Sequence, residues 1–470
     1  MSADRSWTIT PTLACFAAFA GFGFWLLDGD VHAVADRLTA TRDSDGAAPT
    51  AGPVFTAKPI MVAEADDDDD TKVPLPVPIP AVAGDRSHAG ALEDVCLDPV
   101  GAAPAACKRW GMDGVFKAMT ASKAGKLGRP VRVSWYGDSV IATDAIPGRL
   151  RTRLQTTFGD GGPGFVYVVA PHRFCVHEGV DRSAGGGWLT YGISTAQVGD
   201  KLYGVGGSTA ETIGGHATLK LLAGTATNLE LYYLTQPKGG TATITADGTS
   251  VITADTSGDA KAPGYATGTI AGGGKKLKLE ATGKVRVFGL AIENTSGAVV
   301  DNLGIVSVNV KSFTNHDQAN FVAELGHRKA DLVMIMIGAN EAAWLSPGDR
   351  DTKDYQQRYE TVLALLRKGR PDGACLVVSP TDQAEAKDGS YPSRPVMPVL
   401  VAAQRKAAFA QGCAFYSTYD WMGGRGSAAQ WFRKGLVGSD FQHLSRRGAN
   451  KMADGVYDAL TAGFARYASP

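Results

Sequence analysis

Short apolar runs alternate with helical patterns along most of the chain after residue 130, and this alternation constrains the fold more than any other feature. The apolar runs are VRVSWY (131–136), ADLVMIMI (330–337), CLVVSP (375–380) and CAFYS (413–417). Amphipathic helical patterns lie between and after them, at residues 146–158, 317–327, 354–369, 395–411 and 445–468. Strands that alternate with helices in this way predict a parallel sheet covered by helices, which is a doubly wound α/β domain.

Residues 213–295 follow a different pattern, because they show almost no helical period. The segments LELYYL, TATITADG and KLKLEATGKVRVFGLAIE alternate apolar and polar residues, and QPKGG, DG and AGGG separate them. These separators are hairpin and turn signals at close spacing. We therefore predict an antiparallel β-sandwich inserted into the α/β domain. The alternative is an elaborate antiparallel edge of the same domain.

The N-terminal region contains an uncharged apolar stretch, ITPTLACFAAFAGFGFWLL, from Ile9 to Leu27. Nineteen such residues are roughly enough to span the core of a bilayer. No clear cleavage site follows the stretch, so a retained membrane anchor is favoured over a cleaved signal peptide. The predicted anchor or uncleaved signal therefore covers residues 1–28.

Residues 29–95 have the composition of a disordered linker. They include five consecutive aspartates, at 66–70, followed by alternating prolines. Like charges repel one another and prolines favour extended polyproline II, so a solvated tether is preferred over a cation site. Beyond the linker we predict a first part of the α/β domain at 96–212, the insert at 213–295 and a second part at 296–470.

Charge and cysteine content exclude some classes of protein. Lys+Arg and Asp+Glu both number 47, and a net charge of zero argues against a nucleic-acid binder. Cys96 and Cys107 flank a short loop and can form a disulfide outside the cytoplasm. Cys375 and Cys413 each open a predicted strand, so they are either neighbours or buried apolar residues. Cys175 has no obvious partner, and no cysteine shows metal-ligand spacing; we expect no metal and no cofactor.

Three polar stretches stand where chemistry is expected. Gly137-Asp138-Ser139 and Gly338-Ala339-Asn340-Glu341 each follow a predicted strand, and SDFQHLSRRGA begins at residue 439. Ligands of open α/β sheets bind beyond the carboxyl ends of the strands. Each stretch alone has an ordinary structural explanation, as a turn, a helix cap or a surface pair. Their occurrence together favours a catalytic site.

The residue types in these stretches suit acyl transfer. Ser139 would be the nucleophile, and His443 would accept its proton. Asp440 would fix the imidazole tautomer and stabilise the imidazolium. Asn340 would donate its side-chain amide to the developing oxyanion. Acyl transfer needs this combination of an activated oxygen, a base, an orienting acid and preorganised donors.

The stretches YGDS, IGANEA and DFQHLS resemble the consensus blocks of the SGNH (GDSL-type) hydrolases. The resemblance spans roughly 96–210 and 296–470, and it implies the same roles for Ser139, Asn340, Asp440 and His443. Further stretches, including YYLTQPKGG and DWMGGRGSAAQWF, resemble one branch of that family. The branch carries a β-sandwich insert similar to a carbohydrate-binding module and includes peptidoglycan O-acetylesterases.

The sequence departs from this branch at two positions. Val140 stands where the branch often has histidine. Residues 303–307 read LGIVS where the branch tends to read LGVNG, so Ser307 occupies the position of the glycine that supplies a backbone N–H to the oxyanion. Ser307 is the favoured donor, and Gly207, which precedes the insert, is the alternative.

The resemblance implies an esterase that removes O-acetyl groups from a carbohydrate polymer, such as the cell-wall glycan peptidoglycan, through an acyl-enzyme on Ser139. An acetylated glycan is then the expected substrate, and the cell envelope outside the cytoplasm is the expected location, with the N-terminal helix in the inner membrane. Two alternatives remain: an O-acetyltransferase that uses the same triad, and an inactive glycan-binding wall protein.

Overall fold

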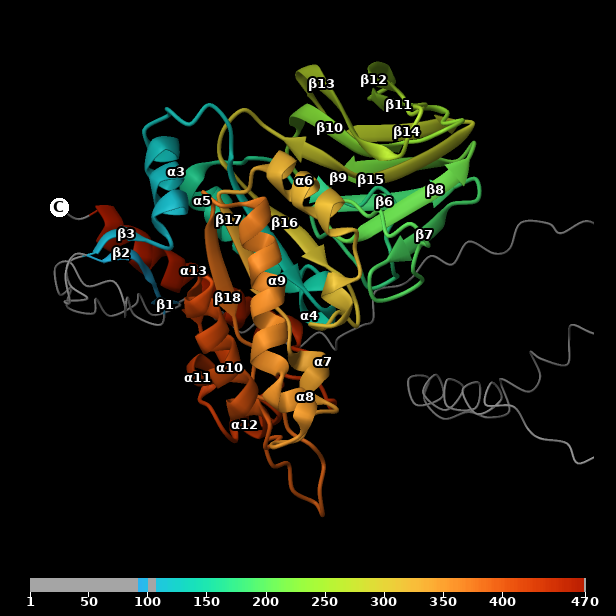
Figure 1. Cartoon of the computed structure of the whole chain (residues 1–470). Coiled ribbons are helices and arrows are strands. Elements are labelled where there is room, and N and C mark those ends of the chain that lie inside the picture. Colours follow the sequence, from blue (N-terminus) through green and yellow to red (C-terminus); the bar gives the residue numbers. More distant parts are fainter. Residues whose placement is uncertain (1–91, 100–106, 469–470) are drawn as a thin grey trace, which may run out of the picture. The chain divides into compact units, whose positions relative to one another are not determined.

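The computed structural model describes residues 92–99 and 107–468 of the chain (Figure 1). The predicted anchor and most of the predicted linker lie outside the described residues. Among the helices that are described, none has the length and apolar character needed to cross a membrane.

A six-stranded sheet forms the centre of the α/β domain, with the strand order β1-β19-β18-β17-β4-β16. Five strands are parallel, namely β4 (Val131–Gly137), β16 (Ala298–Gly304), β17 (Leu332–Met336), β18 (Ala374–Val378) and β19 (Ala414–Tyr416). The edge strand β1 (Leu92–Glu93) runs antiparallel to β19. The arrangement confirms the predicted α/β fold. It also adds β16, which no apolar run had indicated.

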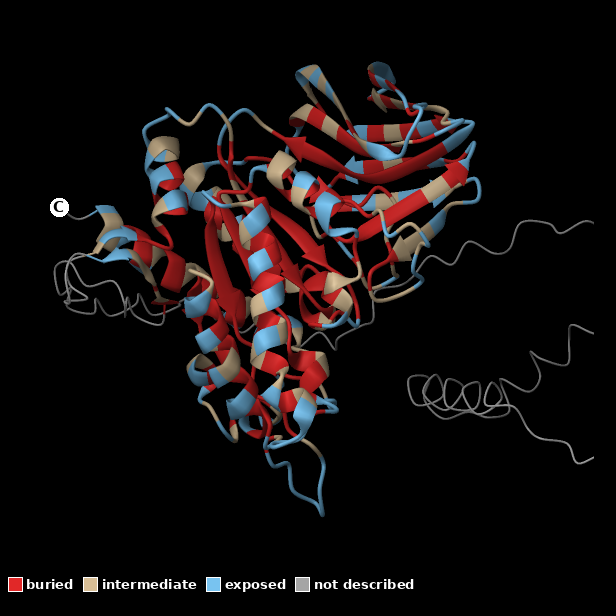
Figure 2. Ribbon diagram, in the orientation of Figure 1, coloured by how far each residue is buried: buried red, intermediate tan, exposed pale blue. Residues whose placement is uncertain are grey.

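Helices cover both faces of this sheet (Figures 1 and 2). The longer ones are α3 (Asp113–Lys123), α5 (Ala145–Phe158), α6 (Gln318–Arg328), α9 (Tyr355–Gly369), α10 (Met397–Ala410) and α13 (Arg446–Ala468). Short elements complete the domain: α4 (Ser139–Ala142), η1 (Ser312–Thr314), α7 (Ala339–Ala342), α8 (Arg350–Lys353), α11 (Thr418–Met422) and α12 (Ser427–Arg433). Successive strand residues face opposite sides, so Met334 joins the core under α5 and α13, while Val333 and Ile335 join the core under α6, α9 and α10.

Two antiparallel sheets occupy the chain between β4 and β16, although these two strands are neighbours in the central sheet. One sheet has the order β13-β10-β15-β8-β7, with β5 also paired to β15, and the other has the order β12-β11-β14-β9-β6. The strands are β5 (Gly164–Val166), β6 (Val180–Gly185), β7 (Leu189–Gly192), β8 (Ser208–Ile213), β9 (His216–Leu221), β10 (Ala226–Thr235), β11 (Thr241–Ala246), β12 (Thr249–Asp255), β13 (Ala262–Gly274), β14 (Lys276–Thr282) and β15 (Lys284–Glu293). Apolar residues of both sheets share one core. The fold is therefore an α/β domain with an antiparallel insertion.

Strand assignments cross two of the predicted domain boundaries. Strands β6, β7 and β8 start before residue 213 and pair within the antiparallel sheets. Strand β1 lies before residue 96 and pairs with β19. These strands are short or polar on one side, so hydrophobic periodicity gives a weak signal for them. The division into domains itself stays a prediction.

Two disulfides join the α/β domain internally. Cys375 bonds to Cys413, which connects β18 to the residue before β19. Cys96 bonds to Cys107, and this pair ties β2 (Cys96–Pro99) to β3 (Cys107–Trp110). Cys375 and Cys413 are therefore neighbours, which was one of the two alternatives for this pair. The pairing of Cys96 with Cys107 is confirmed. Cys175 is buried with a free thiol.

A buried ion network joins the central sheet to the antiparallel region. Arg328 of α6 is almost fully buried and contacts Asp301 of β16 at 2.7 Å and Glu293 of β15 at 2.7 Å. Arg132 of β4 also pairs with Glu293. Charges are buried at low cost only when they are paired and hydrogen-bonded. The network therefore fixes β15 against the sheet that carries the candidate site.

Candidate active site

Ser139 lies directly beyond the carboxyl end of β4, a central strand of the parallel sheet. The strand ends at Gly137, and α4 turns back over it at once. A Cβ atom at Gly137 would lie 2.3 Å from Cγ1 of Ile141, so only glycine permits this close approach. Asp138 caps α4 by accepting a hydrogen bond from the N–H of Val140 at 3.0 Å. The turn thus presents the Ser139 hydroxyl beyond the carboxyl ends of the parallel strands.

Ser139, His443 and Asp440 form a continuous hydrogen-bonded relay. The Ser139 Oγ lies 2.7 Å from Nε2 of His443. Nδ1 of His443 lies 2.7 Å from Oδ2 of Asp440, and Oδ1 of Asp440 accepts from the N–H of His443 at 2.9 Å. The aspartate thereby holds the imidazole in the orientation in which Nε2 faces the hydroxyl.

The relay changes the protonation of its own members. The hydrogen bond that His443 donates to Asp440 raises the pKa of His443 above its ordinary value, and burial opposes this change. Burial by itself would raise the pKa of Asp440, but the hydrogen bonds from His443 lower it overall. Asp440 therefore remains ionised whenever His443 accepts a proton, and it stabilises the imidazolium.

The loop that carries Asp440 and His443 is fixed by a backbone hydrogen bond and by a buried ring. Residues 434–445 connect α12 to α13, and the N–H of Gly438 donates to the carbonyl of His443 at 2.7 Å. Phe441, between the two relay residues, is buried and has a φ of 55°. Its ring packs against Tyr391 and Phe432. Burial of this ring fixes the turn that aims Asp440 and His443 at the sheet.

Asn340 and the loop after β16 face each other across the site. Asn340 lies in α7, just beyond the end of β17. Its Nδ2 donates to the carbonyl of Val308 at 2.8 Å. One Nδ2 hydrogen is used in this bond, and the amide has a second to offer. Ser139 is the first residue of α4, so its N–H has no acceptor within that helix.

Ser307 occupies the left-handed region, with a φ of 63°, and is exposed. Glycine adopts this backbone conformation most easily. This explains why the branch of the SGNH hydrolases that the sequence resembles has glycine at this position. Among the described residues, the Ser307 N–H donates no backbone hydrogen bond. Gly207 also has a positive φ, of 71°, but its N–H already donates to the carbonyl of Gly204 at 2.8 Å. The geometry thus favours Ser307 over Gly207 as a donor.

Two buried carboxylates lie beneath the site, those of Glu341 and Asp138, and the sequence analysis assigned no role to either. Oε1 of Glu341 accepts from the N–H of Val310 at 2.8 Å, so Glu341 and Asn340 together hold residues 308–310. Burial raises the pKa of Glu341 to about 7 and that of Asp138 to about 6. Their proximity in sequence to Asn340 and Ser139 was visible, but burial of their carboxylates depends on the tertiary structure.

Val140 points into the apolar core beside Ile141 and is no part of the relay. Val140 replaces a histidine that is frequent in the branch that this sequence resembles. The replacement therefore leaves the three relay residues in place. Within residues 92–99 and 107–468, no group of three or more His, Cys, Asp or Glu side chains is arranged to hold a metal ion.

Residues 272–450 match the model of the GDSL-like Lipase/Acylhydrolase family. The matched segment contains Asn340, Asp440 and His443, while Ser139 precedes it. A search of curated proteins found no match.

The comparison with solved structures found several esterases. A peptidoglycan O-acetylesterase is 24% identical, with a TM-score of 0.64, and the match covers 74% of this chain and 95% of that one. A family two carbohydrate esterase from Clostridium thermocellum is 12% identical, with a TM-score of 0.24 over 58% of this chain and 97% of that one. An acetylxylan esterase from Geobacillus stearothermophilus is 20% identical, with a TM-score of 0.25 over 36% and 73%. The first of these likenesses shows a shared fold, and the TM-scores of the other two are too low to support an argument.

Proposed function

We propose that this chain, whose residues 272–450 match the model of the GDSL-like Lipase/Acylhydrolase family, is a carboxylic ester hydrolase that removes O-acetyl groups from a carbohydrate polymer. The leading candidate for that polymer is peptidoglycan. The observation that carries the proposal is the relay in which Ser139 Oγ contacts His443 Nε2 and His443 Nδ1 contacts Asp440, each at 2.7 Å.

The relay supports a two-step mechanism. Ser139 Oγ attacks the carbonyl carbon of the acetyl ester while His443 Nε2 takes the hydroxyl proton. His443 then gives this proton to the departing sugar oxygen, which leaves an acetyl group on Ser139. Water attacks that acetyl-enzyme with His443 again as the base, and acetate is released.

Three donors are available for the tetrahedral oxyanion. They are the backbone N–H groups of Ser139 and Ser307 and the side-chain amide of Asn340. Preorganised donors of this kind contribute most where charge develops in the transition state. Glu341 is a positioning residue in this scheme, because its carboxylate holds the N–H of Val310 and with it the loop that follows Ser307.

Three observations support a glycan outside the cytoplasm as the substrate. The fold is shared with a peptidoglycan O-acetylesterase over most of the length of that protein. The disulfides Cys96–Cys107 and Cys375–Cys413 are typical of an oxidising compartment. The uncharged stretch at residues 9–27 agrees with attachment to the inner membrane from the outer side.

The test is acetate release by the full-length protein in detergent. The substrates are O-acetylated peptidoglycan, acetylated xylan and a small aryl acetate, with Ser139→Ala as the matched control. We expect release that depends on Ser139, with the highest kcat/KM on one polymer. Acetyl transfer to an added sugar acceptor, in place of acetate release, would favour the transferase. Glycan binding with no release from any substrate would favour the binding protein.

A further inference from the structure

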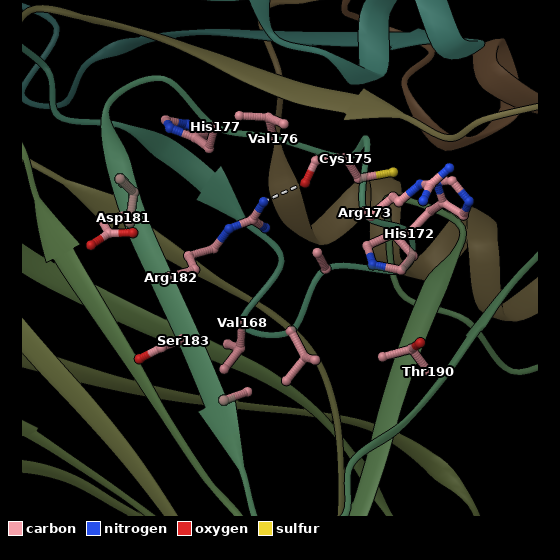
Figure 3. Close-up of a pocket in the computed structure, with 15 residues that line it drawn as sticks. Val168, His172, Arg173, Cys175, Val176, His177, Asp181, Arg182, Ser183 and Thr190 are labelled. Atoms are coloured by element: carbon pink, nitrogen blue, oxygen red, sulfur yellow. Dashed lines mark hydrogen bonds between the residues drawn. The ribbon is translucent and has the colours of Figure 1, made fainter. Parts of the chain in front are cut away.

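A cavity of about 530 Å³ lies between the edge strands of the two antiparallel sheets (Figure 3). Strand β6 is the last strand of one sheet and β7 the last strand of the other, and residues 168–177 connect the cavity to the α/β domain. This volume falls in the range of pockets that bind small ligands, roughly 300–1,000 Å³. The cavity contains none of the relay residues.

Two guanidinium groups line the cavity. Arg182 reaches from β6 toward the turn that carries Arg173, whereas Asp181 points to the other side of the strand (Figure 3). The Arg182 guanidinium donates only to backbone carbonyls, those of Tyr167, at 2.9 Å, and Cys175. No carboxylate forms an ion pair with it within the described chain. Arg173 is exposed and lies over the ring of Phe174 at 4.8 Å.

The two histidines of the cavity lining, His172 and His177, add no charge to that of the two arginines at neutral pH. Burial lowers the pKa of His177 to about 3, and burial together with Arg173 lowers that of His172. Both rings are therefore neutral at pH 7. The lining carries two arginines and one aspartate, Asp181, so its formal charge is +1. Arg182 is half-buried and forms no ion pair with a carboxylate of the described residues.

Two residues of the cavity wall pack against segments that carry active-site residues. The N–H of Val176 donates to the carbonyl of Ala142, the last residue of the helix that begins at Ser139. Cys175 packs with Ala142 and with Val306, which precedes Ser307. These contacts join the turn that holds Arg173 to the helix that begins at Ser139, and we expect a polymer whose acetyl ester sits at Ser139 to extend toward that turn.

We propose that this cavity is a subsite for a carboxylate of the glycan, bound by Arg173 with Arg182 behind it. The inference rests on the proposed function and narrows its substrate to acidic O-acetylated glycans. Arginine suits this role because its planar fork of donors matches a carboxylate. In peptidoglycan the carboxylate has two sources, the lactyl ether of the sugar and the stem peptide.

The test uses three forms of one O-acetylated peptidoglycan glycan. The first retains its stem peptides, the second has free lactyl carboxylates, and the third has those carboxylates reduced to alcohols. We compare kcat/KM for the full-length protein, for Arg173→Glu and for Lys284→Glu. Lys284 is an exposed residue of β15 outside the cavity lining, so it controls for the same change in net charge.

We expect the wild-type protein to prefer the free lactyl form over the reduced form by roughly ten-fold, the size of a charge-assisted hydrogen bond. Arg173→Glu should bring this ratio to about one, and Lys284→Glu should keep it. A wild-type ratio near one, or a ratio that Arg173→Glu leaves at ten, would overturn the inference. A preference for the stem-bearing form that Arg173→Glu removes would assign the subsite to the peptide carboxylates.

Failure of the proposed function gives a different result. In that case none of the three glycan forms releases acetate, while the aryl acetate is still hydrolysed. Calorimetric titration of Ser139→Ala with the free and reduced glycans then tests the subsite without turnover. Tighter binding of the free form, lost when Arg173→Glu is added, would support the subsite, and equal affinities would refute it.

Discussion

The Oγ atom of Ser139 and the Nε2 atom of His443 lie 2.7 Å apart, although 304 residues separate them in the chain. The contact exists because β4 lies inside the parallel sheet and α13 packs on α5 beside it. Arg149 of α5 pairs with Asp454 of α13 at 3.0 Å, which fixes the two helices against each other. The relay therefore depends on packing across the whole domain.

Removal of a relay residue should abolish turnover while the protein remains folded. We expect His443→Ala and Asp440→Asn each to lower kcat/KM for an aryl acetate by roughly 10⁴-fold, because the base is lost or its tautomer is wrong. Circular dichroism and the thermal unfolding midpoint serve as the folding control. Wild-type rates in His443→Ala would remove this residue from the mechanism.

The pH dependence of activity should follow His443. The imidazole must be neutral to accept the serine proton, and Asp440 raises its pKa above 6.5. Activity should therefore fall with decreasing pH, with a midpoint above 6.5. Asp440→Ala should move the midpoint of the residual activity to lower pH. A midpoint unchanged in that variant would mean that another group controls the profile.

Stability should change with pH in the opposite direction, which separates the two effects. A raised pKa means that the protonated form of His443 favours the folded state. This contribution is present below about pH 6.5 and is lost as the pH rises through the folded-state pKa. The loss of activity at low pH is thus not explained by His443-linked unfolding. Thermal unfolding measured across the same pH range checks this point.

The oxyanion donors should differ in their response to substitution. Asn340→Ala removes a donor, and we expect kcat to fall by about 10²–10³-fold. Ser307→Gly keeps the backbone N–H and suits the φ of 63°. Its effect on kcat should be at least about ten-fold smaller than that of Asn340→Ala. An equal loss in both variants would show that the Ser307 side chain itself takes part.

Glu341 should make stability depend on pH near neutrality. Burial raises its pKa to about 7, so the folded state favours the protonated carboxyl. The stabilisation is present below about pH 4.5 and is lost as the pH rises through about 7. Glu341→Gln mimics the neutral form, so its unfolding free energy relative to wild type should rise by up to about 3 kcal/mol between pH 5 and 8. Urea unfolding at both pH values measures this, and a constant difference would contradict it.

The two disulfides should differ in their contribution to stability. The sequence separations of the bonded cysteines are 38 for Cys375–Cys413 and 11 for Cys96–Cys107. Loop-closure entropy predicts costs of about 4 and about 3 kcal/mol for their removal. Denaturant unfolding of the two paired Cys→Ala variants gives the comparison. A larger loss from Cys96–Cys107 would show that its two-stranded sheet matters more than loop length.

Hydrophobic pattern located the elements that are apolar throughout. The run at 131–136 became β4 (Val131–Gly137), and the pattern at 146–158 became α5 (Ala145–Phe158). It did not reveal β16, because this buried strand contains Asp301 and Asn302. Asp301 is buried there paired with Arg328 of α6, and Ser134 and the N–H of Phe165 also donate hydrogen bonds to its carboxylate. A charge that is neutralised by a distant residue breaks the apolar pattern on which a sequence prediction depends.

The sequence by itself determined the alternation of strands and helices and the residue types at the strand ends, because these follow from local periodicity and turn chemistry. The tertiary structure alone decided which of these residues meet. It brought His443 to Ser139, placed Ser307 in the left-handed region and turned the Glu341 carboxylate onto the N–H of Val310. It also left Arg182 half-buried and without an ion pair among the described residues. Hydrogen bonds and charge burial depend on distances between remote segments, and only folding sets those distances.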